Sequence, residues 1–393
     1  MASNRKSDIF EKYDLTEYGF LTMTAIPKLS ESFDEWEQVV AHLPELNKNH
    51  LTRAAINRLE TFEWSQLKDP WQWKRAYVVL TLLTNSYVFS ESPPATKIPS
   101  KLAVPLVEVS IHLGINPILT HAAVDLYNWD IIDPAKPFGL DNLKSVSLMT
   151  GTRSEEWFYL IMVAIEKVGG NIISNILDIM DDIQRNHHGG IVVALQEINS
   201  SLGKCCDIIK RMKENCKPEI FWNNLRPFLA GWKNNDNLPN GMIYEDVTPR
   251  PLEFFGGSAA QSSLFQVIDA VFGIKHDSEY FNEIRDYMPK KHREFIKFVE
   301  KNVKLGEYIK DSNLDALNKC YNDCIKTVEK FRKLHYGLVY TYIIKMVKKE
   351  KGETLTEENE ENTESSEKGT GGTDLRSFLN QSIEDTKDSQ LGS

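Results

Sequence analysis

Apolar residues recur at intervals of three and four along most of the chain, the spacing of one face of an α-helix. Residues 33–46 and 49–62 show this spacing clearly. A convincing run of alternating apolar and polar residues, the mark of a half-buried strand, does not occur. The pattern therefore predicts an all-α fold.

Proline and glycine interrupt the helical pattern at residues 90–105 and 128–144. A chain of 393 residues also exceeds the usual size of one hydrophobic core. We therefore expect a small N-terminal helical domain over residues 1–148 and a larger helical domain over residues 149–347.

The sequence becomes polar and acidic from Lys348, where it reads KKEKGETLTEENEENTESSEK. Such a segment has too few apolar residues to form a core, which predicts a disordered acidic loop over residues 348–368. Order is expected to return within residues 369–383, in a C-terminal segment and tail that spans 369–393.

Composition and charge narrow the range of partners. The formal net charge of −10 argues against binding to nucleic acid or to an anionic membrane surface. No apolar run approaches eighteen residues and the N-terminus has no apolar signal region, so we expect a cytoplasmic protein. The five cysteines lack CxxC spacing, which favours neither a disulfide framework nor a structural zinc site.

The main candidate for chemistry is a histidine in an otherwise apolar helical stripe. Arg332 lies one turn before His335, and Gly337 removes a side chain nearby. A core histidine bonded to a carbonyl is the ordinary alternative. An imidazole on iron with a guanidinium on a propionate would instead suit an iron porphyrin. The stripe consists of Leu317, Tyr321, Cys324, Val328, Phe331, His335, Leu338 and Tyr342.

A glycine-rich loop precedes another predicted helix, in LEFFGGSAAQSSLFQVIDAVFG (252–273). Ser258 and Gln261 have the spacing of a capping box, which would place backbone N–H groups where an anion can bind. A simple capped helix is equally compatible with this pattern. Asp269 falls on the apolar face of that helix and needs a partner, for which an arginine is suitable.

A third candidate lies in PEIFWNNLRPFLAGW (218–232), where Phe221 and Leu229 share a face and Arg226 adjoins it. This arrangement offers an aromatic wall beside a group that binds carboxylates, although a surface arginine is a common alternative. His292, which follows a proline and two lysines, is expected to have a capping or surface role.

Five segments together resemble the indoleamine 2,3-dioxygenase family over nearly the whole chain: GGSAAQSSLFQVIDAVFG, LRPFLAGWK, MPKKHREF, FRKLHYGLVYTYI and KGTGGTDL. The resemblance implies a two-domain helical fold, with haem b in the larger domain and an electron donor that keeps the iron ferrous. It also implies a monomer that uses O₂ to open the indole ring of L-tryptophan. The product would be N-formyl-kynurenine, made in the first step of the kynurenine pathway towards NAD.

The resemblance assigns roles to individual residues and no general acid or base. His335 would be the proximal iron ligand, and Arg332 a propionate partner supported by Asp269. Phe221 would lie near the indole and Arg226 would bind the substrate carboxylate. The remaining matches are Leu229 in the pocket wall, Gly257, Ser258 and Ala259 in the distal loop beside cofactor and substrate, and Thr370 in a segment that covers the substrate.

Two positions depart from the family pattern. Phe158 matches a family aromatic residue, but Met162 stands where mammalian members have serine and His121 where they have tyrosine. These departures leave open a second interpretation: a haem-binding member with low tryptophan turnover that acts as a haem or redox sensor or as a signalling scaffold.

Overall fold

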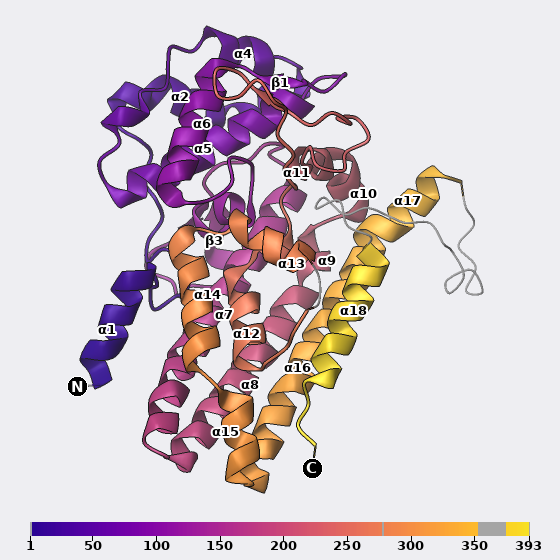
Figure 1. Cartoon of the computed structure of the whole chain (residues 1–393). Coiled ribbons are helices and arrows are strands. Elements are labelled where there is room, and N and C mark those ends of the chain that lie inside the picture. Colours follow the sequence, from indigo (N-terminus) through magenta and orange to yellow (C-terminus); the bar gives the residue numbers. More distant parts are fainter. Residues whose placement is uncertain (1, 277–278, 353–374, 393) are drawn as a thin grey trace.

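The computed structural model describes residues 2–276, 279–352 and 375–392 (Figure 1). Helices dominate the described chain, so the predicted all-α class is confirmed. Strands β1 (Lys97–Ile98) and β4 (Ile243–Tyr244) pair in parallel. Strands β2 (Trp129–Ile131) and β3 (Leu143–Ser145) pair antiparallel. Each pair is only two or three residues long, so it joins loops and does not form a layer of the fold.

Most of the N-terminal third forms a group of short helices around the longer α5 and α6, in the upper part of Figure 1, whereas α1 lies lower and contacts α14 (Lys290–Asn302). Asp69 caps α5 through a capping box with Gln72, and Gly114 ends α6 in the left-handed conformation. The elements are α1 (Ala2–Tyr13), η1 (Glu31–Phe33), α2 (Asp34–Ala41), α3 (Leu43–Lys48), α4 (Thr52–Arg58), η2 (Trp64–Gln66), α5 (Pro70–Phe89), α6 (Ser100–Leu113), η3 (Ala122–Leu126) and η4 (Leu140–Asn142).

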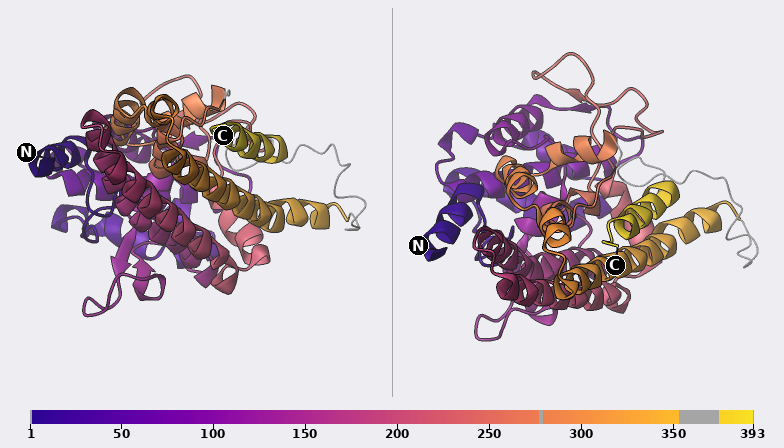
Figure 2. Two further views of the ribbon diagram at one scale, coloured as in Figure 1. Left: turned by 90° about the horizontal axis from the view of Figure 1, so that it is seen from below. Right: turned by 60° about the horizontal axis from the view of Figure 1, so that its bottom comes forward.

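The rest of the chain forms a bundle around three long helices, α7, α8 and α16, which run side by side in both views of Figure 2. The elements are α7 (Arg153–Gln184), α8 (His188–Lys210), α9 (Met212–Asn215), α10 (Pro218–Ile220), η5 (Phe221–Leu225), α11 (Arg226–Leu229), η6 (Ala259–Gln261), α12 (Ser263–Val271), α13 (Glu279–Glu283), η7 (Ile284–Tyr287), α14 (Lys290–Asn302), α15 (Leu305–Ser312), α16 (Asp315–Val339), η8 (Tyr340–Ile344), α17 (Lys345–Glu350) and α18 (Leu375–Asp388).

Helix α7 is the central element of this bundle. It is long and apolar enough to cross a membrane, but 72% of its most apolar window is buried inside the protein. Gly170 allows the N-terminal segment to approach closely, since a Cβ there would lie 2.1 Å from the carbonyl oxygen of Glu17. The burial is that of a core helix.

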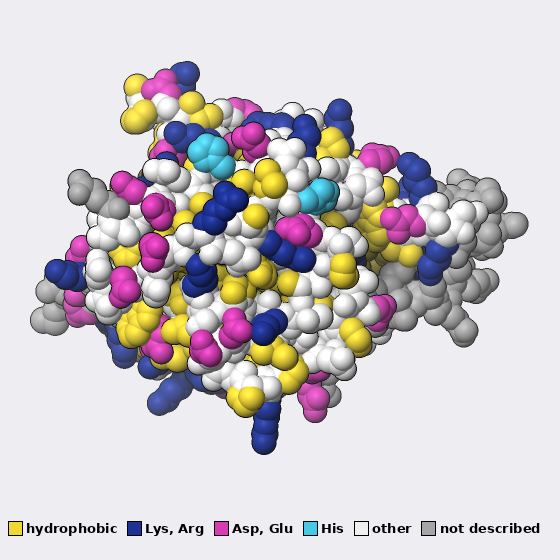
Figure 3. Space-filling model, turned by 90° about the horizontal axis from the view of Figure 1, so that it is seen from above, with side chains coloured by type: hydrophobic (Ala, Val, Ile, Leu, Met, Phe, Trp, Pro, Cys, Tyr) yellow, Lys and Arg dark blue, Asp and Glu magenta, His cyan; other side chains and the backbone are white. Residues whose placement is uncertain are grey.

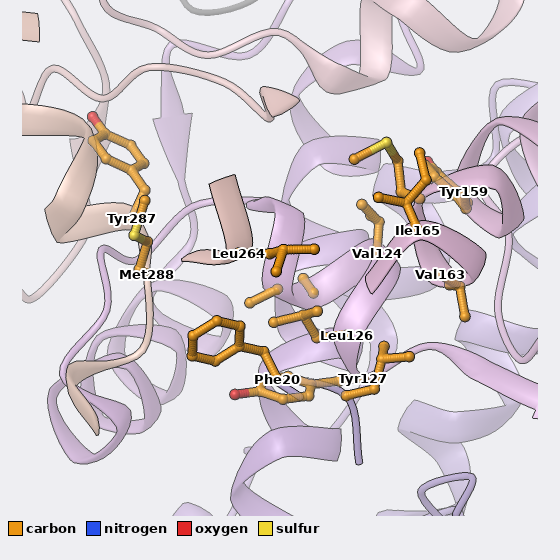
Figure 4. Close-up of a cluster of buried hydrophobic side chains, with 14 of the residues drawn as sticks. Phe20, Val124, Leu126, Tyr127, Tyr159, Val163, Ile165, Leu264, Tyr287 and Met288 are labelled. Atoms are coloured by element: carbon orange, nitrogen blue, oxygen red, sulfur yellow. The ribbon is translucent and has the colours of Figure 1, made fainter. Parts of the chain in front are cut away.

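Buried side chains from both halves of the sequence pack together (Figure 4). Phe20 and Tyr127 lie in the same cluster as Val163 and Leu264. The predicted domain boundary near residue 148 falls in the connection between β3 and α7. The division into two domains stays a prediction, and the halves share a core.

The C-terminal part differs from its prediction at one point. Helix α17 continues to Glu350 and buries Lys348, so the predicted disorder does not begin at residue 348. Residues 353–374 lie outside the described chain. Helix α18 then runs beside α16 (Figures 1 and 2). In the view of Figure 3, charged side chains of both signs are spread over the surface and do not form a single patch.

Candidate functional site

A cavity lies between α7, α16 and α18 in the larger bundle and encloses about 1280 Å³ of space not filled by atoms, part of it open to solvent. Most of its wall is apolar or aromatic. Helices α7 and α16 contribute Phe158, Met162, His335, Leu338 and Val339. Helix α18 contributes Leu375, Phe378 and Leu379, and the glycine loop contributes Gly257, Ser258, Ala259 and Ala260.

Three π-helical turns, η3, η5 and η8, border this cavity. Each widens its helix by one residue per turn, a distortion often found at functional sites. The turns bring Asp125, Phe221 and Tyr342 to the wall. The Phe221 ring packs against Phe158, with centroids 5.0 Å apart, and meets Tyr342 edge-on. The aromatic wall predicted around Phe221 is therefore present.

His335 faces the cavity, as its place in the apolar stripe of α16 predicts. Neither ring nitrogen has a hydrogen-bond partner among the residues that the structure describes. Burial, with a smaller contribution from Arg332, lowers the pKa of His335 to about 4. The imidazole is therefore neutral at pH 7, and a lone pair is available to a ligand in the cavity. The alternative of a core histidine bonded to a carbonyl does not hold.

Arg332 and Asp269 form the pair that the sequence predicts. The Arg332 Nη2 atom lies 2.5 Å from Oδ1 of Asp269, and its Nη1 donates to the carbonyl of Ser382 and to the Thr386 hydroxyl. His276 bridges Asp269 at 3.0 Å and Asp385 at 2.7 Å. This network joins α12 and α16 to α18, so Arg332 has protein partners and is absent from the cavity wall.

The glycine loop approaches the cavity in a way that differs from the prediction. Gly256 passes against the end of α11, where a Cβ would lie 2.1 Å from the carbonyl oxygen of Leu229. The Ser258 hydroxyl accepts from the backbone N–H of Ala260, which caps the short turn η6. Gln261 does not complete a capping box, because its side chain bonds to the carbonyl of Gly256 and the N–H of His121.

A second histidine, His121, lies on the wall formed by η3, and its environment is the opposite of that of His335. Its Nδ1 lies 2.7 Å from Oδ2 of Asp125, and its Nε2 lies 3.0 Å from Oε1 of Glu166. Ser262 donates to that same Glu166 oxygen at 2.5 Å. Burial alone would lower the pKa of His121, but Asp125 and Glu166 together raise it to about 10. His121 is therefore charged at neutral pH.

The remaining predicted site residues are placed as follows. Leu229 and Met162 line the cavity. Arg226 does not: its guanidinium lies over the ring of Trp222, 4.4 Å from the centroid, and it borders a separate surface hollow. Burial lowers the pKa of Arg226. Thr370 lies outside the described residues.

Two sequence interpretations are wrong. His292 is fully buried and packs against Phe20, with ring centroids 4.6 Å apart, so it has no surface role. Burial lowers its pKa to about 3. Gly337 is exposed on α16 and lies outside the cavity wall, so it does not make room for a flat ligand.

Sequence reasoning missed Asp125 and Glu166. The signal for Asp125 was available, because an acid four residues after His121 in an apolar stretch faces the same side of a helix. Glu166 is the one charged residue of the apolar stretch FYLIMVAIE, and nothing in that stretch indicates its partner. Its contact with His121 joins positions 45 residues apart.

These residues fit a haem. A porphyrin is flat and mostly apolar, and its iron needs a neutral imidazole with an available lone pair. The aromatic and aliphatic wall and the unpaired imidazole of His335 provide both features. Because Arg332 is held by Asp269 and α18, a contact with a propionate would require it to exchange or share these partners.

Comparison with known proteins gives a consistent result. The family model described as indoleamine 2,3-dioxygenase matches residues 9–389. Indoleamine 2,3-dioxygenase 1 of Mus musculus is 33% identical, over 98% of this chain and 96% of its own. The indoleamine 2,3-dioxygenase of Saccharomyces cerevisiae is 31% identical, over 97% and 94%. A 6-hydroxytryptophan 2,3-dioxygenase of Fusarium equiseti is 31% identical, over 93% of each chain. The chain therefore belongs to the indoleamine 2,3-dioxygenase family of dioxygenases.

Proposed function

We propose that this protein is a haem b-dependent dioxygenase that inserts both atoms of O₂ across the indole C2–C3 bond of L-tryptophan and forms N-formyl-kynurenine. The observation that carries the proposal is the neutral imidazole of His335, which faces a largely apolar cavity and has no hydrogen-bond partner in the described part of the chain. When bound, haem would supply the iron that activates O₂, with His335 as its protein ligand.

The chain's own contribution is to bind and orient the substrate. Phe221 and Phe158 offer aromatic faces for an indole ring, and the apolar wall excludes water from it. Met162 lines the same space and is not a useful proton acceptor. We assign no general base, because the reaction adds both oxygen atoms of O₂ to the indole ring and no proton is gained or lost overall.

Arg226 is the proposed partner of the substrate carboxylate. It follows Leu225 directly in the chain and lies between Phe221 and Leu229, which both line the cavity. To reach a ligand, its guanidinium would leave the ring of Trp222, and a carboxylate would supply a charge-assisted bond in exchange.

The experiment is steady-state formation of N-formyl-kynurenine by the haem-loaded, reduced protein, at micromolar and millimolar L-tryptophan. We expect product that depends on both tryptophan and O₂. A haem-loaded protein that forms no product at either concentration would contradict the proposal.

Replacing Arg226 with alanine tests the assigned orientation. The change should weaken the use of tryptophan by the equivalent of about 1.5–3 kcal/mol. Tryptamine, which lacks the carboxylate, is the matched control and should be used equally by both proteins. Equal losses with the two substrates would make Arg226 a structural residue.

A second candidate function is a haem or redox sensor with low tryptophan turnover. The charged His121 and the acid Asp125 on the wall favour it, because the hydrocarbon edge of an indole ring gains nothing from them. A strong haem absorption band with negligible turnover at millimolar tryptophan would support this function.

A further inference from the structure

One part of the cavity wall is polar and closed to solvent. His121 and Asp125 are each 3% exposed, and Glu166, which lies behind them, is 1% exposed. Leu375 and Phe378 of α18, in contrast, are only half-buried and mark the side of the cavity nearer to solvent. The acidic group therefore lies at the closed end.

Asp125 has one oxygen in use and one without a partner. Its Oδ2 accepts from His121, whereas its Oδ1 has no hydrogen-bond partner among the residues described. A buried oxygen without a partner is costly, and such a group usually marks a place for a water or a ligand. Asp125 lines the cavity, so a molecule bound there would lie beside its carboxyl group, which would have to turn to present the buried Oδ1 to it.

The charges of the network also favour a hydrogen-bond donor. One imidazolium, on His121, lies between two carboxyl groups, those of Asp125 and Glu166. The network thus holds more acceptor capacity than His121 and the Ser262 hydroxyl can satisfy. An anionic ligand group would be repelled, and an apolar ring edge would leave Oδ1 unsatisfied.

We propose that Asp125 determines specificity by accepting a hydrogen bond from a hydroxyl group on the benzo ring of the substrate. The preferred substrates are then ring-hydroxylated indole amino acids. The orientation follows from chemistry: if the amino-acid end lies towards Arg226 and solvent, the edge furthest from it is the benzo edge at C5 and C6. This inference rests on the proposed function and refines its substrate class.

The test is calorimetric binding, without O₂, to the haem-loaded ferric protein. We expect 5-hydroxy- or 6-hydroxytryptophan to bind about tenfold or more tighter than L-tryptophan, as for a site built to bond a hydroxyl. The corresponding methyl ether, which keeps the oxygen but lacks the donor, should lose that advantage. Equal binding of tryptophan and all four ring-hydroxylated isomers would overturn the proposal.

Two variants locate the acceptor. Asp125→Val should reduce the preference for the hydroxylated ligand to near onefold, whereas Asp125→Asn, which keeps an oxygen acceptor, should retain part of it. Met162→Leu alters the cavity wall without removing a hydrogen-bond acceptor. The ratio of the affinities for hydroxytryptophan and tryptophan should therefore stay at its wild-type value. If Asp125→Val weakened tryptophan and its hydroxylated forms alike, the indole N–H or the fold would be the group affected, and the proposal would fail.

Failure of the broader function gives a different result. A protein that binds hydroxytryptophan preferentially but forms no kynurenine product would contradict the dioxygenase activity and leave the specificity role of Asp125 intact. A protein that turns over tryptophan but binds it as tightly as its hydroxylated forms would support the dioxygenase activity and contradict the specificity role of Asp125.

Discussion

The walls formed by α16 and by η3 each present a histidine to the same cavity, and the two histidines have opposite charge states. Burial and Arg332 act on His335, no acidic side chain among the residues of the structure that are described offsets them, and its pKa is lowered to about 4. His121 lies between Asp125 and Glu166, and its pKa is raised to about 10. At neutral pH one ring can offer a lone pair to a metal and the other cannot.

The comparison shows that neighbouring groups decide which role a histidine can have. His292 is a useful third case, because burial also keeps it neutral. It packs against Phe20 in the core and does not line the cavity that His335 faces, so a neutral imidazole alone does not make a ligand position. A histidine that binds a metal needs both a neutral imidazole and a cavity beside it.

The largest expected effect is the loss of haem in His335→Ala. The variant should lose its Soret absorption almost completely, more than the roughly 10- to 100-fold weakening typical of removing a group that only supports a ligand. Added imidazole should restore the band, since it can occupy the vacated position. His121→Gln is the contrasting variant and should keep the band; equal loss in both would remove the distinction between the walls.

The next effect is on stability. His121→Leu leaves Asp125 and Glu166 buried without their cation, which should lower the free energy of unfolding by about 3–5 kcal/mol. Urea unfolding at pH 7 measures this loss. Adding Asp125→Asn and Glu166→Gln to the same chain removes the stranded charges and should recover most of it; no recovery would mean that His121 acts by packing.

Alkaline pH should lower the stability that the charged His121 gives to the η3 wall. The native pKa of His121, about 10, lies above its value in the unfolded chain, near 6.5. The stabilisation is therefore complete below about pH 6.5 and is lost progressively as pH rises towards 10. Unfolding between pH 7 and 8.5 should show this decline. The triple variant without the charged network should show a flatter profile, and identical slopes would contradict the assignment.

The smallest effect concerns the α16 wall. Arg332→Gln should raise the pKa of His335 in the haem-free protein, but keep it below 6.5, because burial is the larger cause of its depression. Arg332→Lys keeps the positive charge and should leave the pKa near 4. Titration of the imidazole by NMR would distinguish the two, and equal shifts would indicate a change of packing.

The sequence predicted the α16 wall better than the η3 wall. The apolar stripe placed His335 at the cavity, and the buried acid Asp269 required the arginine that it has. Those signals are local or follow from the cost of a lone buried charge. The partners of His121 come from η3 and α7, and contacts between distant segments leave little trace in one sequence.

The π-helical turns explain some of the site positions that the sequence did not predict correctly. Regular spacing of three and four assumes 3.6 residues per turn, so an inserted residue shifts every later position on the helix face. Arg226 directly follows the turn η5, and its side chain lies against Trp222 instead of at the cavity. His292 was misjudged because its burial depends on Phe20, far away in the sequence.

The position of α18 has a consequence for how the protein is made. This helix supplies part of the cavity wall and is tied to the bundle through Arg332 and His276, yet it follows all the other described elements in the chain. During synthesis the ribosome releases it after them, so the rest of the bundle emerges with one side of the cavity still open. The haem that we propose would thus have a broad path to His335 before α18 docks. Once α18 has docked, it covers part of that path, so we expect its docking to set the order of assembly and to slow the exchange of a haem bound in the cavity.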